Sequence, residues 1–400
     1  MFEPDSTRAV PAWKARPAPT ARRAFHCRCG RPVFFGNSRC LACDTPLGYQ
    51  PESALVCPLE PAGPEGVWRV VGADGPRLPY LRRCANFRSA AACDWLVQVD
   101  ASGTAAQPWC RACRLNRLIP DQSDADNRFW WARIERAKRR LVSSLIALGL
   151  PVRSRVEDPQ RGLAFDLLRT PLAGPTVMTG HFNGVITVNV EEADDVRRER
   201  TRATFQEPYR TVLGHLRHEA GHYYWHRLVE GTRWHEPFRE LFGDERADYS
   251  AALRRHHRQG PAERWPLLNI SAYASAHPWE DWAETWAHYL HMIDTLDTAF
   301  SYGIHAEGAL QHEPFSAEAL FDRGAEDGAA FLSFVNGWIE LTGVLNELSR
   351  SMGQPDFYPF VLPAAAVPKL HFIHRVAASE RSIGGGMTGG SRTGTGLSIG

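Results

Sequence analysis

Two histidines and a glutamate lie close together in the segment His218-Glu219-Ala220-Gly221-His222. On a helix, side chains four residues apart lie on the same face, so both imidazoles can bind one metal ion. Glu219 lies beside them, where its carboxylate can take a proton from a water molecule bound to that metal. The neighbouring Leu216 and the run Tyr223-Tyr224-Trp225 indicate that this helix is buried. Burying these polar groups costs free energy unless a metal compensates them, so the segment predicts a metal site.

A catalytic zinc ion needs a third protein ligand and an open position for water. Residues 278–288 predict a helix whose tryptophans, at positions 279, 282 and 286, form an apolar stripe that we assign to core packing. Glu280 and Glu284 lie one turn apart on its polar side. We predict that Glu280 is the third ligand and that Glu284 orients a ligand imidazole. The alternative interpretation is an exposed acidic face.

A second acidic segment, residues 242–248, also follows the histidine pair at a spacing that could supply a third ligand. Arg246 lies among its carboxylates, and the segment adjoins a predicted turn. We therefore assign these carboxylates to salt bridges and prefer Glu280 as the third ligand. His215 lies one turn before His218, and His226 lies one turn after His222. We expect each of these two extra histidines to be a hydrogen-bonded neighbour of the site or a surface residue.

All nine cysteines lie in the first third of the chain, and eight of them fall into two sets of four. Short cysteine spacings allow two thiolates to bind one zinc ion from a tight turn, and a second pair completes a tetrahedral shell. Because four thiolates leave no open position, both sites are predicted to be structural. The ninth, Cys57, is predicted to be a buried apolar thiol. The first set is Cys27, Cys29, Cys40 and Cys43, and the second is Cys84, Cys93, Cys110 and Cys113.

The spacing of apolar residues predicts the helices and strands that must position these candidate ligands. The pattern predicts helices over 128–150 and 208–229, strands over 163–168 and 185–190, and a helix-rich remainder to about residue 350. Pro208 suits the first turn of the second helix, and Asn183-Gly184 predicts a hairpin turn. The strand over 185–190 is either an ordinary half-buried strand or an edge strand on which an extended peptide could pair.

The combination of His218-Glu219-x-x-His222 with Glu280-x-Trp-Ala-Glu284 resembles the gluzincin metallopeptidases. It is most similar to the branch that contains anthrax lethal factor and the Mlc titration factor peptidases. In that branch the first glutamate of the second motif binds zinc, and a tyrosine seven residues earlier stabilises the oxyanion; Tyr273 has that position here. Over residues 25–370 the chain also resembles bacterial zinc-binding metallopeptidases with an N-terminal zinc ribbon, from which the short Cys27-x-Cys29 spacing departs.

The resemblance implies a zinc-dependent peptidase that acts on peptides or proteins. In this interpretation His218, His222 and Glu280 bind a catalytic Zn²⁺, Glu219 is the general base, and Tyr273 is the oxyanion donor. The chain would then bind three zinc ions, one catalytic and two structural. The alternative is a catalytically silent zinc-binding scaffold that recruits a protein, or nucleic acid, through its ribbons. The presence of Glu219 and Tyr273 favours the peptidase, because a silent scaffold needs neither.

The resemblance and the pattern together predict an α+β fold, with N-terminal zinc-ribbon modules and a mainly helical gluzincin-like metallopeptidase domain that carries a small β-sheet. We predict a flexible leader over 1–22, a zinc-ribbon region over 23–118, a metallopeptidase-like domain over 119–380 and a disordered Gly-rich tail over 381–400. Four hundred residues suffice for two or three domains.

Composition bears on partners and location. The formal net charge is +1, so no global field would recruit nucleic acid or a membrane. Residues 1–120 hold 16 basic and 9 acidic side chains, an excess of +7. Eight thiolates together with two Zn²⁺ ions would reduce this excess to +3, which makes a weak case for nucleic-acid binding. The first ten residues include Glu3 and Asp5 and have no apolar core, which argues against a secretory signal. Without a run of about 18 apolar residues we predict no membrane span, and we expect a cytoplasmic protein.

Overall fold

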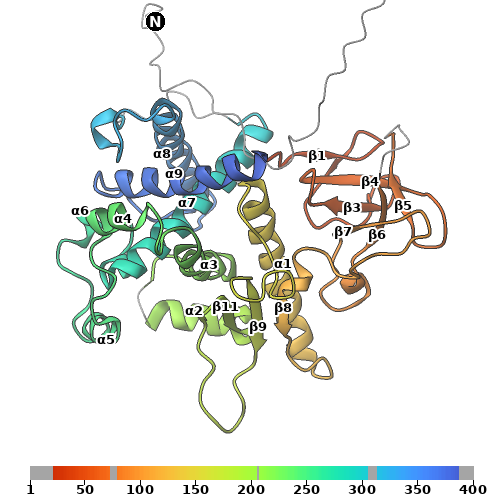
Figure 1. Cartoon of the computed structure of the whole chain (residues 1–400), viewed down its shortest axis with the longest axis horizontal. Coiled ribbons are helices and arrows are strands. Elements are labelled where there is room, and N and C mark those ends of the chain that lie inside the picture. The colour runs from red at the N-terminus through yellow and green to blue at the C-terminus, as the bar shows by residue number, and fades with distance from the viewer. Residues whose placement is uncertain (1–20, 73–78, 205–206, 305–312, 387–400) are drawn as a thin grey trace, which may run out of the picture.

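The computed structural model describes residues 21–72, 79–204, 207–304 and 313–386 (Figure 1). It contains a β-rich N-terminal region, coloured red to orange, and a mainly helical remainder, so the predicted α+β class is confirmed. Most of the predicted leader lies outside the described residues, as does most of the predicted tail. The first six residues of that tail, 381–386, continue the last helix instead of forming a separate segment.

The N-terminal region consists of a short hairpin and a five-stranded antiparallel sheet whose strands follow one another in chain order. Cys57 lies in this sheet within a small cluster with Leu59, Leu81 and Leu96, as predicted for an apolar thiol. Burial raises the pKa of Cys57 to about 11, so the thiol stays protonated. The hairpin is β1 (Phe25–His26) with β2 (Pro32–Val33), and the sheet is β3 (Leu47–Gln50), β4 (Leu55–Pro61), β5 (Trp68–Val70), β6 (Tyr80–Arg83) and β7 (Leu96–Val99).

A second sheet has the strand order β10-β11-β9-β8. β9 pairs in parallel with both β8 and β11, whereas β10 pairs with β11 as an antiparallel hairpin. The turn of that hairpin is the predicted Asn183-Gly184, whose φ angles are both positive (46° and 76°), as a two-residue hairpin turn of this kind requires. The bounds are β8 (Asn116–Leu118), β9 (Ala164–Leu168), β10 (Gly180–Phe182) and β11 (Val185–Asn189).

The sheet order corrects one expectation. β11 corresponds to the strand predicted over 185–190, but it has a neighbour on each side and cannot accept a further strand. The sheet has two edge strands, β8 and β10, and β10, which is only three residues long, was not predicted as a strand. Of these two edges, β10 contacts α3, so a peptide that pairs with the sheet beside that helix would pair with β10.

The helices form the remainder of the fold, and the two that carry the predicted ligands, α3 and α7, lie against each other. α3 begins later than predicted because Thr211 caps it: Oγ1 of Thr211 accepts a hydrogen bond from the backbone N–H of Gly214 at 3.0 Å. Pro208 therefore precedes the helix. The bounds are α1 (Ala125–Ala147), α2 (Asp195–Thr204), α3 (Val212–Leu228), α4 (His235–Phe242), α5 (Tyr249–Gln259), α6 (Trp265–Leu268), α7 (Pro278–Ser301), α8 (Gly328–Ser351) and α9 (Ala366–Gly386).

Gly221 lies where α3 packs closely against α7. A Cβ atom on it would lie 3.0 Å from Cα of Ala283 and 3.2 Å from Cβ of Trp286. Its carbonyl accepts a hydrogen bond of 2.8 Å from Nε1 of Trp282. The glycine in the histidine motif is therefore needed for helix packing, because only a residue without Cβ permits this approach.

We expect Gly221→Ala to separate the two helices. Overpacking at this site should reduce the free energy of unfolding by about 1–3 kcal/mol and should also weaken zinc binding, because the two helices carry the metal-binding groups. Urea unfolding and zinc titration would measure both effects. The matched control is Gly337→Ala in α8, where a Cβ atom meets nothing within 4 Å, so stability should stay the same or rise. Equal effects of the two substitutions would contradict this account.

The β-rich region is joined to the helices by a buried cluster of charges. Asp294 of α7 pairs with Arg23 at 2.7 Å, with Arg140 of α1 at 2.7 Å and with Arg217 of α3 at 2.8 Å. The side chains of Asp294, Arg23 and Arg217 are each at least 90% buried. One carboxylate therefore connects the N-terminal segment with three helices.

A second connection runs from the last cysteine into the second sheet. Sγ of Cys113 lies 3.9 Å from Oε2 of Glu135 in α1, and Oε1 of Glu135 accepts a 2.6 Å bond from Nζ of Lys138. Lys138 also donates to the side chain of Asn116, the first residue of β8. Glu135 and Lys138 are fully buried. The second cysteine set and β8 are thus parts of one packed unit.

α8 is long and apolar enough to cross a membrane if length and composition alone are considered. Half of its apolar stretch is buried inside the protein, and the buried residues include Phe331, Val335, Trp338 and Leu341. This burial is typical of a core helix that packs against other helices.

Candidate metal centre

Three potential ligand atoms converge between α3 and α7. Nε2 of His218 and Nε2 of His222, both on α3, lie 3.1 Å apart. Oε2 of Glu280, in the first turn of α7, lies 3.0 Å from the first nitrogen and 3.6 Å from the second. All three side chains are buried. The structure therefore brings together the three residues that the sequence nominated as ligands.

The donor set fits a zinc ion. Zinc bonds of about 2.0–2.1 Å in a tetrahedral site place two ligand atoms roughly 3.3 Å apart, which matches these separations. Oε2 of Glu280 is buried and makes no hydrogen bond within the described part of the chain, although two imidazole nitrogens lie close to it. A cation among the three atoms would satisfy all of them. Two histidines and one carboxylate are also the ligand set of catalytic zinc sites, which keep a fourth position open.

Neighbouring side chains hold the ligands in place. Nδ1 of His218 lies 2.6 Å from Oε1 of Glu284, and the other oxygen of Glu284 accepts a 2.6 Å hydrogen bond from Oγ of Ser271. The hydroxyl of Tyr249 donates to Oε1 of Glu280, which leaves Oε2 for the metal. Glu284 thus lies where it was predicted to orient an imidazole. Ser271 and Tyr249 were missed, because their loop and helix reach the site only in the folded chain.

Glu219 is held by a histidine that lies between two carboxylates. Nε2 of His215 lies 3.2 Å from Oε1 of Glu219, and Nδ1 lies 2.6 Å from Oε2 of Glu192. Burial opposes a charge on His215, but the two carboxylates outweigh it and raise the pKa of His215 to about 10. Burial alone would raise the pKa of Glu219, whereas the bond from His215 and the nearby imidazoles bring it below its usual value. Glu219 is therefore a carboxylate that can accept a proton.

Tyr273 lies in a one-turn helix (Tyr273–Ser275) just before α7, with its ring centroid 5.9 Å from that of His218. Burial, and then the charge of Glu280, raise the pKa of the Tyr273 hydroxyl well above its usual value. The hydroxyl therefore stays protonated at neutral pH and can donate a hydrogen bond beside the ligands.

The tryptophans of α7 do not all play the expected role. Trp282 and Trp286 are fully buried in the core, as the apolar stripe predicted. Trp279 is only half-buried, and its ring packs against that of His222 with centroids 4.0 Å apart and an interplanar angle of 41°. Trp279 also packs against the core, so its assignment to core packing holds in part, but the side chain additionally contacts a predicted ligand.

The competing acidic segment is engaged elsewhere. Asp244 pairs with Arg246 at 2.8 Å. Glu245 pairs with Arg239 at 2.6 Å, and this bond lowers the pKa of Glu245 to about 2. Asp248 caps α5 by accepting a hydrogen bond from a backbone N–H. These contacts agree with the structural role assigned to the segment.

The remaining extra histidine, His226, lies on the far side of His222. Its Nδ1 lies 3.0 Å from Oε2 of Glu230. His226 is therefore a hydrogen-bonded residue outside the group of ligand atoms.

Both cysteine sets form compact clusters. The sulfur atoms of Cys27 and Cys43 are 3.6 Å apart, and those of Cys29 and Cys40 are 3.8 Å apart. These separations exceed the roughly 2.05 Å of a disulfide and match the edge of about 3.8 Å expected for a tetrahedron with zinc–sulfur bonds of about 2.3 Å. The short Cys27-x-Cys29 spacing therefore still allows both sulfur atoms to join the cluster. The second set, Cys84, Cys93, Cys110 and Cys113, also brings its four sulfur atoms within 4.8 Å of one another.

The two clusters differ in exposure, which predicts different metal lability. Cys29 and Cys43 are exposed, whereas all four cysteines of the second set are buried. We expect a chelator to remove zinc from the first cluster at least about tenfold faster, because ligand exchange requires access to the metal. Release would be followed with a coloured zinc indicator in a His222→Ala background, which removes the third site. Cys29→Ser should eliminate only the fast phase; a single common rate would contradict the assignment.

Comparisons with known proteins agree with this architecture. Uncharacterized proteins of Mycobacterium tuberculosis and Mycobacterium bovis are 44% identical to this chain over 357 residues, covering 88% of this chain and 95% of theirs. No solved structure matches the chain. Residues 24–124 match a zinc-ribbon domain, and residues 127–376 match the family described as "Putative zinc-binding metallo-peptidase". The chain therefore belongs to this zinc-binding metallo-peptidase family and carries an N-terminal zinc-ribbon domain.

Proposed function

We propose that the protein is a zinc-dependent peptidase of the gluzincin type, with one catalytic and two structural zinc ions. The convergence of His218, His222 and Glu280 beside the carboxylate of Glu219 supports this proposal. Zinc bound there would polarise a peptide carbonyl and lower the pKa of a bound water towards about 7.

In this proposal Glu219 is the general base. Oε1 of Glu219 faces His215, whereas its buried Oε2 has no hydrogen-bond partner within the described residues. His215 thus fixes the carboxylate so that Oε2 can take a proton from the attacking water and pass it to the leaving amine. Tyr273 donates a hydrogen bond to the carbonyl oxygen, which becomes an oxyanion when water attacks the carbonyl carbon.

The substrate backbone would pair with β10. This strand is one of the two edges of the described sheet, and it contacts α3, which carries the histidines. An extended peptide can add to such an edge through main-chain hydrogen bonds, so binding would depend little on side chains. The proposal replaces β11 by β10 as the strand that receives the substrate.

The test compares the wild-type protein with His222→Ala. The wild type should contain three zinc ions per chain and cleave a mixture of unstructured peptides. His222→Ala should contain two zinc ions and cleave none, because the third site loses one of its ligands. A wild-type protein with three zinc ions that cleaves no peptide would refute the proposal and favour a zinc-binding scaffold.

A further inference from the structure

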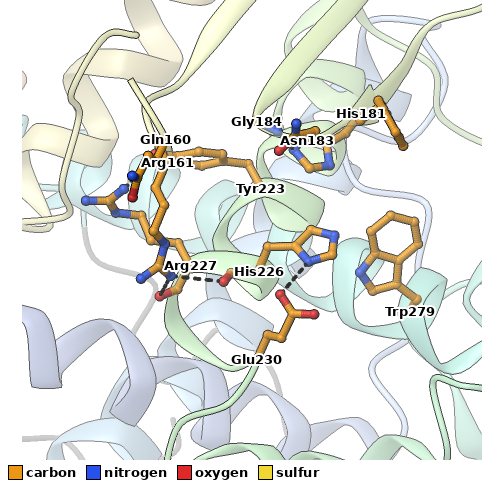
Figure 2. A pocket seen from close by; sticks show the side chains of 11 residues that line it. Gln160, Arg161, His181, Asn183, Gly184, Tyr223, His226, Arg227, Glu230 and Trp279 are labelled. Atoms are coloured by element: carbon orange, nitrogen blue, oxygen red, sulfur yellow. Dashed lines mark hydrogen bonds and ion pairs between the residues drawn. The ribbon is translucent and has the colours of Figure 1, made fainter. Parts of the chain in front are cut away.

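A cavity of about 370 Å³ opens beside the metal centre (Figure 2). It lies between the β10–β11 hairpin, the C-terminal half of α3 and the first turn of α7. Figure 2 shows Trp279 and His226 on one side of this space and Arg161 and Arg227 on the other. The aromatic side chains that line it are His181, Phe182, Tyr223, His226 and Trp279.

The cavity adjoins both the metal centre and the strand edge. Trp279 lines the cavity, packs against the ligand His222 and directly precedes the ligand Glu280. His181 and Phe182 belong to the edge strand β10. A peptide that pairs with β10 and presents a carbonyl to the metal therefore passes the mouth of this cavity. Because Trp279 lies against one ligand and next to another, we assign the side chain that enters the cavity to a residue next to the bond that is cut.

Aromatic rings form part of the cavity wall. The ring centroids of His181 and His226 are 5.6 Å apart, and those of His226 and Trp279 are 5.5 Å apart. Nε2 of His181 accepts a hydrogen bond of 3.0 Å from the backbone N–H of Gly184, so this histidine is neutral. Phe182 is 84% exposed and leaves its ring free for a bound molecule. Such surfaces favour another aromatic ring, which gains stacking contacts in addition to burial.

Each charged side chain that lines the cavity already has a partner. Arg161 donates to the backbone carbonyl of Arg227 at 2.8 Å, and Arg227 pairs with Asp158 at 3.1 Å. Glu230 pairs with His226 at 3.0 Å. A charged substrate side chain would compete with these contacts, whereas an uncharged ring would leave them in place.

We propose that this cavity binds an aromatic side chain of the substrate, at a position next to the bond that is cut. The inference rests on the proposed peptidase function and names its substrate class: extended peptides with phenylalanine, tyrosine or tryptophan at that position. A six-membered ring fits a cavity of about 150 Å³, so the space here can also accept an indole.

The test has a cleavage arm and a binding arm. In the first, wild-type protein is incubated with a diverse peptide library, and mass spectrometry locates the cut bonds; aromatic residues should be enriched at one flanking position. In the second, zinc-loaded Glu219→Gln binds peptides that differ only there, as Phe, Leu, Ala or Lys, in calorimetric titrations. The Phe peptide should bind at least about tenfold more tightly than the Ala peptide.

Two variants in that background alter the cavity. Phe182→Ala removes an exposed wall and should weaken binding of the Phe peptide about fivefold to tenfold, with less than a twofold effect on the Ala peptide. Gln160→Trp fills the space from its exposed rim and should have the same selective effect. The matched control is Phe129→Ala, which removes a 59% exposed phenylalanine from α1.

The outcomes separate the two proposals. Cleavage without aromatic enrichment, or a preference that both variants leave unchanged, overturns the aromatic pocket and leaves the peptidase intact. Aromatic-dependent binding that both variants weaken supports the pocket even if the wild type cleaves nothing, which would refute only the peptidase.

Discussion

Glu219→Gln is expected to retain all three zinc ions and to lose peptide hydrolysis by about 10³-fold or more. General-base catalysis contributes roughly 10²–10⁴-fold, and a glutamine amide of the same shape cannot accept the proton of the attacking water. His215 can still donate to the amide oxygen, so the side chain should keep its position. Metal analysis and kcat/KM for a cleaved peptide would be measured on the same preparation.

Glu236→Gln is the matched control, because Glu236 is an exposed glutamate of α4 that pairs with Arg239. It should change neither zinc content nor kcat/KM. Full activity in Glu219→Gln would show that another group is the base. Loss of a zinc ion in that variant would show that Glu219 is needed for metal binding, and the assignment of its role would be wrong.

Asp294→Asn is expected to lower the free energy of unfolding by about 3–5 kcal/mol, because it removes the charge that compensates the surrounding arginines. Two of these, Arg23 and Arg217, are buried and would be left without their carboxylate. Urea unfolding followed by circular dichroism would measure the loss. Because Arg23 belongs to the N-terminal segment, protease should also cut the β-rich region away from the helices more readily.

The ion pairs between Asp294 and its three arginines also predict how the stability of the protein changes with pH. Burial alone would raise the pKa of Asp294, but the three arginines outweigh it and hold the pKa well below its usual value. The stabilisation is therefore complete above the ordinary aspartate pKa of about 4 and is lost as the pH falls below it.

Asp195→Asn is the control for Asp294→Asn, because Asp195 binds two arginines but is 61% exposed. Similar losses in both variants would contradict the importance of burial.

The parts of the site that depend on local geometry were predictable from sequence. His218 and His222 share a helix face because the α-helical repeat places them one turn apart, and Glu280 follows Tyr273 at a spacing that a known family shares. Short cysteine spacings likewise placed eight thiolates in two clusters. Each of these inferences depends on residues close together in the chain or on a resemblance.

The contacts that depend on tertiary packing were not predictable. Glu192 and Tyr249 reach the site from elements whose own sequence shows no sign of it. Strand β10 has three residues, one of them Gly180, and is too short to show a two-residue period. Trp279 shares the helical spacing of two core tryptophans, so only the position of α7 in the fold distinguishes it from them.

β8 begins three residues after Cys113, and a buried lysine, Lys138, binds both Asn116 of β8 and the glutamate that contacts that cysteine. The second sheet thus contains a strand that is held beside the second cysteine cluster. During synthesis that cluster leaves the ribosome before α3 and α7 exist. We therefore expect zinc bound by the N-terminal half to stabilise the strand beside which the later half of the chain folds.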